Sequence, residues 1–225
     1  MQAIILSAGR GQRLAPLTDA TPKPLIEVGG KALIEYHLIK LSSIGIESVV
    51  INTGWLGQQI IDKLGNGDQY GLRIDYSIEP ENALETAGGI KQALELIDGE
   101  QFLVCNADVY HEFDLNGLMI KKLMSKQAHL FLINNPEHNL KGDFSIVKGN
   151  LHNKSDSHKS YTYSGIGLYS RSFFSDLGTG KASLGPLLRA KAESELISAE
   201  IVNETWFDIG TLERMQELNN YLKSN

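Results

Sequence analysis

The feature that most constrains the fold is a short apolar run followed at once by a glycine-rich, basic turn. The run Ala3–Leu6 precedes the segment Ser7–Arg13, which holds glycines at positions 9 and 11. A short, wholly apolar run is typical of a strand buried on both faces of a parallel sheet. Glycine lets the backbone turn sharply and approach a ligand closely, because it has no Cβ atom. The sequence therefore predicts a buried strand that ends in a tight loop at one edge of a sheet.

The turn has the chemistry of an anion site. Successive backbone N–H groups in such a turn form a concave surface that binds anions, and Arg10, Arg13 and Lys23 add positive charge near the same end of the strand. A polyphosphate is the simplest ligand that fits, and a solvated glycine turn is the alternative. Two common nucleotide motifs are excluded. Leu14 stands where a dinucleotide fingerprint needs a third glycine, and Gly29–Ala32 lacks the final hydroxyl of a Walker A loop.

Helical and strand patterns alternate along the chain, which predicts an α/β fold with a mixed, mostly parallel sheet flanked by helices. Strands are expected at residues 3–6, 48–51, 73–76, 101–105, 129–133, 144–147, 151–152, 161–169 and 197–202. Helices are expected at residues 32–44, 55–64, 86–97, 115–124, 184–193 and 212–222. The polar stretch 153–160 is expected to be a loop. We expect residues 1–225 to form a single domain whose two halves make the walls of a cleft.

Composition and charge narrow the classes of function. The 225 residues are 42% hydrophobic and 21% charged, which suits one large soluble domain. A net charge of -6 argues against a nucleic-acid surface. No apolar run is long enough to span a membrane and the N-terminus does not resemble a secretion signal, so we expect a cytoplasmic protein, and a monomer. Cys105 is the only cysteine and is expected to be a core thiol, which excludes an intrachain disulfide.

Two aspartates and one lysine are candidates for chemistry. Asp108 follows the expected strand 101–105, at the end where open α/β sheets bind ligands. Asp208 lies between large apolar residues, and a partly buried carboxylate needs a cation or several donors. Each aspartate could instead cap a turn or a helix. Lys23 lies between two prolines that restrict its backbone, which makes it a well-fixed positive charge or, alternatively, a solvated loop lysine.

These segments resemble one enzyme family. Leu6–Leu14 and Thr21–Leu25 are similar to the signature of the sugar-1-phosphate nucleotidylyltransferases, L-(A/S)-A-G-x-G-x-R-(L/M) followed by P-K-P-(L/M). Trp206–Thr211 matches the W-x-D-x-G-T segment of the same family, and the resemblance runs from Met1 to about Leu222. It implies a Rossmann-like fold, with a nucleotide-binding wall at about residues 1–110 and a sugar-binding wall at about residues 111–225.

The resemblance also implies roles for individual residues. Mg²⁺ would be held by Asp108 and Asp208, and the catalytic set would be Arg13, Lys23, Asp108 and Asp208. The nucleotide would contact Ala8, Gly9, Gly11, Gln12, Arg13, Lys23, Glu79, Thr86 and Gly88, the last ones in the segment Glu79–Gly89 that resembles the base-reading region. The sugar phosphate would contact Asn106, Gly142, Asp143 and Gly165.

Departures from the family pattern point to one branch of it. Glu85 replaces the first glycine of the usual L-G-T-A-G segment, and no E-K-P triplet occurs. Lys154 or Lys159 could bind the sugar phosphate in its place, and a solvated surface loop is the alternative. Together with Gly142–Phe144 and the short chain, these features resemble the uridylyltransferases that act on N-acetylmuramate 1-phosphate. They imply a Mg²⁺-dependent, single in-line displacement in which UTP and N-acetylmuramate α-1-phosphate give UDP-N-acetylmuramate and pyrophosphate, in peptidoglycan recycling.

The sequence leaves three alternatives open. A glucose- or mannose-1-phosphate nucleotidylyltransferase would share the fold and the mechanism. A metal-dependent glycosyltransferase would share strand-end carboxylates, usually as D-x-D, but has no use for the loop Gly9–Arg13 and releases no pyrophosphate. A non-catalytic nucleotide sensor on the same fold would be expected to have lost Lys23 or an aspartate, and this chain retains them.

Overall fold

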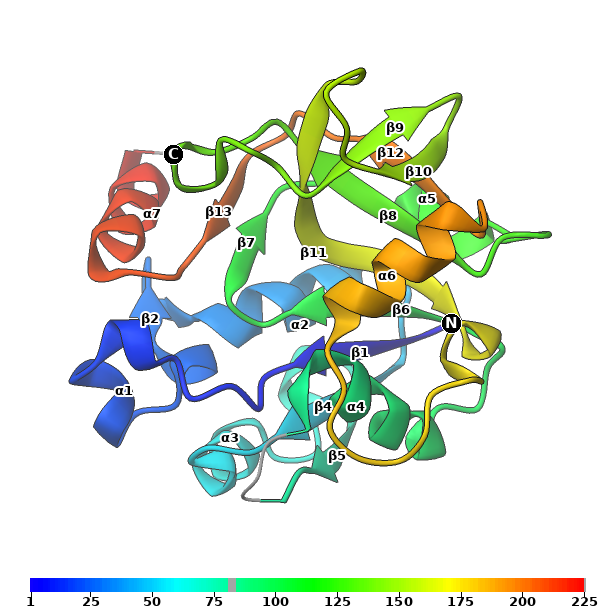
Figure 1. Ribbon diagram of the computed structural model, residues 1–225. Coiled ribbons are helices and arrows are strands. Elements are labelled where there is room, and N and C mark those ends of the chain that lie inside the picture. Colours follow the sequence, from blue (N-terminus) through cyan, green and yellow to red (C-terminus); the bar gives the residue numbers. More distant parts are fainter. Residues whose placement is uncertain (81–83, 225) are drawn as a thin grey trace.

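A nine-stranded mixed sheet carries the strand ends that form the site (Figure 1). The computed structural model describes residues 1–80 and 84–224. The strand order is β5-β4-β1-β6-β11-β8-β12-β10-β9. The strands are β1 (Gln2–Leu6), β4 (Ser48–Thr53), β5 (Arg73–Ile78), β6 (Gln101–Asn106), β8 (Ala128–Ile133), β9 (Phe144–Val147), β10 (Asn150–Asn153), β11 (Ser160–Ser170) and β12 (Ile197–Ile201). β5, β4, β1 and β6 run parallel, so their carboxyl ends share one edge.

The second half of the sheet is built differently. β11 pairs antiparallel with both β6 and β8, whereas β12 pairs parallel with β8. β9 and β10 form a hairpin at the far edge, and β10 pairs antiparallel with β12. The mixed α/β sheet is the fold class that the sequence predicts, and its antiparallel part begins at β11.

Helices cover both faces of the sheet, and β1 shows why. Ala3 and Ile5 pack with α2 (Leu33–Ser43), α3 (Gly57–Leu64) and α5 (Asn116–Ile120). Ile4 faces the opposite layer, which is formed by α4 (Glu85–Ala93) and α6 (Leu184–Glu193). Successive side chains of a strand point to opposite faces, so an unbroken apolar run serves two cores. Cys105 is fully buried in the first of them, as expected, and burial raises its pKa to about 12.

Two small strand pairs and two further helices surround the carboxyl edge. β7 (Val109–His111) pairs antiparallel with β13 (Trp206–Asp208). β2 (Glu27–Val28) pairs with β3 (Lys31–Ala32). The short helix α1 (Leu17–Ala20) and the last helix α7 (Leu212–Ser224) lie at the same end of the molecule (Figure 1). The sequence patterns did not predict these four strands or α1.

Most predicted elements are confirmed within a few residues, with two corrections. The helix expected at 115–124 is wrong beyond Ile120, because α5 ends there and Met124 adopts a left-handed backbone. Ile120 and Met124 are 86% and 87% exposed, so the apolar pattern was not one buried face. The helix expected at 86–97 ends at Ala93 and continues as a 3-10 turn. Among the described residues, no helix is long and apolar enough to cross a membrane.

Candidate active site

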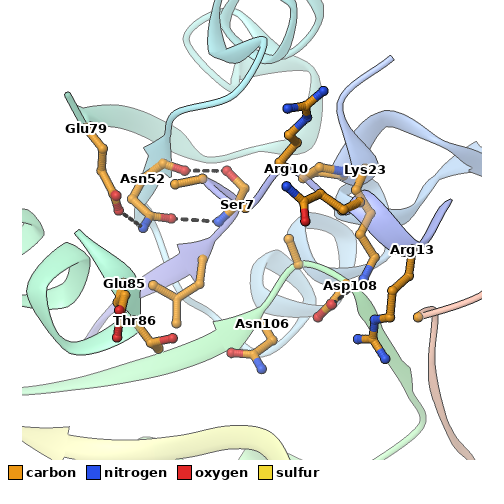
Figure 2. A pocket seen from close by; sticks show the side chains of 18 residues that line it. Ser7, Arg10, Arg13, Lys23, Asn52, Glu79, Glu85, Thr86, Asn106 and Asp108 are labelled. Atoms are coloured by element: carbon orange, nitrogen blue, oxygen red, sulfur yellow. Dashed lines mark hydrogen bonds and ion pairs between the residues drawn. The ribbon is translucent and has the colours of Figure 1, made fainter. Parts of the chain in front are cut away.

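A cavity of about 530 Å³ opens at the carboxyl ends of β1, β4 and β6 (Figure 2). The glycine-rich turn after β1 lines this cavity. The turn lies at the edge of the sheet because it follows directly on the buried strand β1, as the sequence predicts. The cavity is lined by residues 6–13, Lys23, Pro24, Asn52, Glu79, Glu85, Thr86, residues 106–108 and Gly210. The expected polyphosphate loop therefore faces the ends of two neighbouring strands.

A buried hydrogen-bond chain shapes one side of this cavity (Figure 2). The Ser7 N–H donates to Asn52 Oδ1 at 2.6 Å, and Asn52 Nδ2 donates to Glu79 Oε1 at 2.6 Å. The other carboxylate oxygen of Glu79 accepts from the Leu84 N–H at 2.9 Å. Glu79 is only 7% exposed. The Glu79 carboxylate therefore fixes the orientation of Asn52 and ties β4, β5 and the start of α4 to the loop after β1.

Lys23 and Asp108 form an ion pair on the opposite side (Figure 2). The Lys23 side chain is 9% exposed and that of Asp108 is 37% exposed. Lys23 begins a 3-10 turn directly after Pro22, so its backbone position is set by the proline-flanked segment. Arg13 lies in the loop after β1, and a Cβ atom at Gly210 would lie 3.3 Å from Arg13 Cζ. The Arg13 guanidinium is thus close to the second half of the chain.

A second cavity of about 390 Å³ adjoins the first and shares Asn106 and Asp108 with it. Its remaining lining residues are Val109, His138, Asn139, Asp143, residues 162–165, Trp206 and Asp208. The β7–β13 pair brings the two aspartates together: Asp208 lies opposite Val109, and the Ile209 N–H donates to the Asp108 carbonyl oxygen at 2.8 Å. Residues 100 positions apart in the chain thereby become neighbours.

Asp208 is neutralised by its own cation. Its carboxylate is in ion-pair contact with the Arg214 guanidinium, which α7 supplies, and His138 Nε2 lies 3.5 Å from Asp208 Oδ1. The Asp208 side chain is 23% exposed. Each aspartate of the pair therefore contacts a cationic side chain, Lys23 for Asp108 and Arg214 for Asp208, and Asp208 also lies next to His138.

Asn106 lies where the two cavities meet, and Gly165 makes room for it. Gly165 has a φ of 83°, and a Cβ atom there would lie 2.7 Å from Asn106 Nδ2. Asp143 is held by the Tyr163 N–H at 2.9 Å and by Asn139 Nδ2 at 3.2 Å. These contacts hold the Asn106 amide and the Asp143 carboxylate in fixed positions at the second cavity.

The structure brings together most residues that the sequence singled out. The first cavity is lined by Ala8, Gly9, Gly11, Gln12, Arg13, Lys23, Glu79, Thr86, Asn106 and Asp108. The second is lined by Asn106, Asp108, Asp143, Gly165 and Asp208. Gly88 and Gly142 line neither cavity. The predicted base-reading segment includes residues 81–83, which lie outside the residues that the structure describes.

Gly88 and Gly142 have packing roles instead. A Cβ atom at Gly88 would clash with the Gly180 carbonyl oxygen, since the loop before α6 crosses the start of α4 there. Gly142 has a φ of 58°, and a Cβ atom would lie 2.7 Å from Asn135 Oδ1. The glycine that approaches the Glu79–Asn52 chain is Gly89, where a Cβ atom would overlap the Glu79 carboxylate.

The basic candidates for a sugar-phosphate contact point elsewhere. Lys154 Nζ donates to the Gly142 carbonyl oxygen at 3.2 Å, and Lys159 Nζ donates to Asn134 Oδ1 at 3.0 Å. Neither lysine lines a cavity. Glu85 keeps a left-handed backbone, with a φ of 58°, where the family pattern has glycine, and its carboxylate contacts Ser183 and Lys181.

A buried histidine lies beneath the strand end that carries Asp108. Burial lowers the pKa of His37 to about 4, while hydrogen bonds to the backbone of Val109 and Asn106 and the charge of Asp108 act in the opposite direction. The imidazole is therefore neutral at pH 7. His37 packs against His111, with 5.6 Å between ring centroids.

Sequence reasoning missed several residues of the two cavities. Asn52 could have been found, because it is the polar residue that ends the apolar strand next to β1. His138 and Arg214 carried no comparable signal. His138 reaches the second cavity through the turn after β8, and Arg214 reaches Asp208 through the last helix.

Comparison with known proteins identifies the family of this chain. The family described as Nucleotidyl transferase matches residues 2–225. The chain belongs to this family and is a sugar-1-phosphate nucleotidyltransferase. It is 43% identical over 222 residues to N-acetylmuramate alpha-1-phosphate uridylyltransferase of Neisseria meningitidis serogroup B, with 96% of each chain covered. It is 35% identical over 136 residues to D-glycero-alpha-D-manno-heptose 1-phosphate guanylyltransferase of Aneurinibacillus thermoaerophilus, covering 60% of this chain and 58% of the relative.

Solved structures show the same fold. A Bacillus anthracis protein described as a glucose-1-phosphate thymidylyltransferase, in complex with a sucrose, superposes with a TM-score of 0.87 at 22% identity, covering 100% of this chain and 96% of that one. HddC from Yersinia pseudotuberculosis, complexed with GMP-PN, superposes with a TM-score of 0.76 at 21% identity, covering 98% of each chain. At these identities the likeness concerns the fold alone.

Proposed function

We propose that this protein transfers a uridylyl group from UTP to N-acetylmuramate α-1-phosphate, with release of pyrophosphate, as a cytoplasmic monomer in peptidoglycan recycling. The observation that carries the proposal is the junction of two cavities at Asn106 and Asp108. A nucleotide in the first cavity, with its phosphates on the glycine loop, and a sugar phosphate in the second would meet there. The uridylyltransferase relative from Neisseria supports this choice of substrates.

The proposed domain organisation follows from the same junction. All residues that line the first cavity lie within about 1–110, except for Gly210. Most residues that line the second cavity lie within about 111–225. We assign the nucleotide to the first wall and the sugar to the second, within one domain. Glu79 and Thr86 lie at the end of the first cavity away from Lys23 and Asp108, where the base would lie (Figure 2).

The reaction needs no nucleophile from the protein, because a phosphate dianion is itself nucleophilic at pH 7. A phosphate oxygen of the sugar 1-phosphate attacks the α-phosphorus in line, the bond to the β-phosphate breaks, and pyrophosphate leaves. The protein then contributes position and charge. Lys23 is held at the junction and would stabilise the charge that develops on the α-phosphate. Arg13, in the same loop as Gly9 and Gly11, would bind the leaving phosphates.

The donor set at the junction fits Mg²⁺. Asp108 and Asp208 are held side by side by β7 and β13, and both residues line the second cavity. Mg²⁺ is often bound by one or two carboxylates, with water and phosphate oxygens as the other ligands. When bound there, the ion would offset negative charge on the phosphates. Lys23 and Arg214, which now contact the two carboxylates, would turn to the phosphates instead.

Pyrophosphate release tests the proposal. The enzyme is assayed with Mg²⁺ against a grid of UTP, GTP, TTP and ATP with the 1-phosphates of N-acetylmuramate, N-acetylglucosamine, glucose and mannose. We expect the highest kcat/KM with UTP and N-acetylmuramate 1-phosphate. A higher value for another pair would refute the proposed substrates but keep the mechanism. No release with any pair would refute the mechanism for these substrate classes.

A further inference from the structure

Oxygen acceptors dominate the second cavity. Three carboxylates line it, those of Asp108, Asp143 and Asp208. Among its described lining residues, His138 is the only one with a basic side chain. A sugar with an acidic substituent would be repelled by such a lining unless a donor met its charge. His138 is therefore the group in this cavity whose chemistry suits a second anion besides the sugar phosphate.

The His138 ring is held in a defined orientation. It lies in a 3-10 turn, Glu137–Asn139, between β8 and β9, and it stacks on Trp206 with 6.4 Å between ring centroids and 19° between planes. Trp206 is fixed in turn, because its Nε1–H donates to the Ser164 carbonyl oxygen at 2.9 Å. The His138 side chain remains 38% exposed. Its Nε2 lies 3.5 Å from Asp208 Oδ1, and this nitrogen would be available to a ligand when Asp208 binds Mg²⁺ as proposed above.

Neighbouring donors of the cavity are already engaged. Asn139 Nδ2 donates to Asp143 Oδ1 at 3.2 Å and to Thr162 Oγ1 at 3.1 Å. The Thr162 hydroxyl donates to Asn135 Oδ1 at 3.0 Å. A ligand carboxylate bound on this side of the cavity would therefore be met by His138.

We propose that His138 selects for the acidic substituent of the sugar by donating a hydrogen bond to its carboxylate. This inference rests on the proposed function, since the lactyl ether of N-acetylmuramate supplies that carboxylate. N-acetylglucosamine 1-phosphate has the same ring with a hydroxyl group in place of the lactyl ether. The difference between these two substrates isolates the contribution of the lactyl group, and the change of this difference in a His138 variant measures the contribution of His138.

The test compares two variants with the wild-type enzyme. His138→Phe keeps an aromatic ring for stacking on Trp206 but removes the ring N–H donor, and His138→Gln keeps an amide donor without the ring. We measure kcat/KM for N-acetylmuramate 1-phosphate and for N-acetylglucosamine 1-phosphate with UTP. His158→Gln is the matched control, because His158 is exposed and lines neither cavity.

We expect His138→Phe to lower the preference for the acidic sugar by about 10- to 100-fold, as for the loss of a hydrogen bond to a charged group. The loss should appear mainly as a higher KM for N-acetylmuramate 1-phosphate, and it should exceed any loss of kcat/KM for the neutral sugar. His138→Gln should retain part of the preference, and His158→Gln all of it. Melting temperatures should stay close to that of the wild type.

Three results would overturn the inference, and they differ from a failure of the proposed function. If His138→Phe lowers kcat/KM equally for both sugars, His138 supports the site but does not select the substrate. If it changes neither value, His138 is not in contact with the substrate. If the wild-type enzyme shows no preference for N-acetylmuramate 1-phosphate, the proposed substrate fails first, and the inference fails with it.

Discussion

Replacement of Glu79 by glutamine tests the buried chain that shapes the first cavity. The Glu79 carboxylate accepts from Asn52 Nδ2 and from the Leu84 N–H, and Asn52 Oδ1 accepts from the Ser7 N–H. Glutamine has nearly the same shape but only one acceptor oxygen, so its NH₂ group must face another donor. A rotation of the Asn52 amide does not help, because its NH₂ group would then face the Ser7 N–H.

The size of the effect follows from burial. Glu79 is 7% exposed, so water has little access to a donor left without a partner. Such a buried donor costs about 1–3 kcal/mol, and we expect a loss of about 2 kcal/mol in the free energy of unfolding. In a protein of this size that loss corresponds to a melting temperature lower by about 4–8 °C. KM for UTP should rise as well, since Asn52 and Glu79 both line the cavity.

Urea unfolding and initial rates at varied UTP check both expectations. Glu95→Gln is the matched control, because Glu95 is exposed and lines neither cavity. The control should remain within about 0.5 kcal/mol of the wild type. If Glu79→Gln is as stable as Glu95→Gln and binds UTP normally, the reasoning is refuted: the fixed direction of the hydrogen bonds would then not determine the shape of the cavity.

Four further predictions each concern a single residue. Lys23→Ala should lower kcat at least about 100-fold while circular dichroism shows a native fold, and a near-normal kcat would remove Lys23 from the mechanism. Gly9→Ala should leave stability unchanged but raise KM for UTP, because a Cβ atom there meets nothing within 4 Å in the free protein. Gly11→Ala should lower the melting temperature, since Gly11 has a φ of 67° and a Cβ atom would lie 3.1 Å from Lys23 Cβ; equal stability of the two glycine variants would contradict this. His37 has a folded-state pKa of about 4 against 6.5 when unfolded, so the unfolded state binds the extra proton in that window. The free energy of unfolding should therefore fall by about 1.4 kcal/mol per pH unit for His37 as the pH drops from about 6.5 to about 4. In urea titrations His37→Gln should remove this slope and His152→Gln should keep it; an unchanged slope in His37→Gln would contradict the assignment.

The parts of the fold that follow local rules could be predicted from the sequence. β1 and β6 are apolar runs of strand length, and α2 ends close to Gly45, so periodicity and a helix stop signal locate them. β7 and β13 could not be predicted in this way. They are three residues long, and each exists only because the other, 95 positions away in the chain, supplies the hydrogen bonds.

The same distinction between local and long-range features applies to the residues of the site. The loop after β1 and Lys23 lie in one continuous motif, and Asp108 lies at a strand end, so sequence reasoning found them. The partners of the charges did not follow from the sequence. Arg214 contacts Asp208 because α7 returns to the carboxyl edge, and His138 reaches Trp206 because the turn after β8 packs over β13. Such contacts depend on tertiary packing, which no local pattern encodes.

The two ion pairs show how an acidic protein can keep a site for anions. β7 and β13 place Asp108 and Asp208 side by side, and neighbouring carboxylates repel unless each has a cation. Lys23 and Arg214 supply these cations in the structure. Under the proposed mechanism, phosphates take over the two cations while Mg²⁺ takes the two carboxylates. No charge of the two ion pairs is left without a partner in this exchange, which avoids the cost of an unpaired, partly buried charge. Because either ligand alone would leave one set of charges unpaired, nucleotide and metal are expected to bind together.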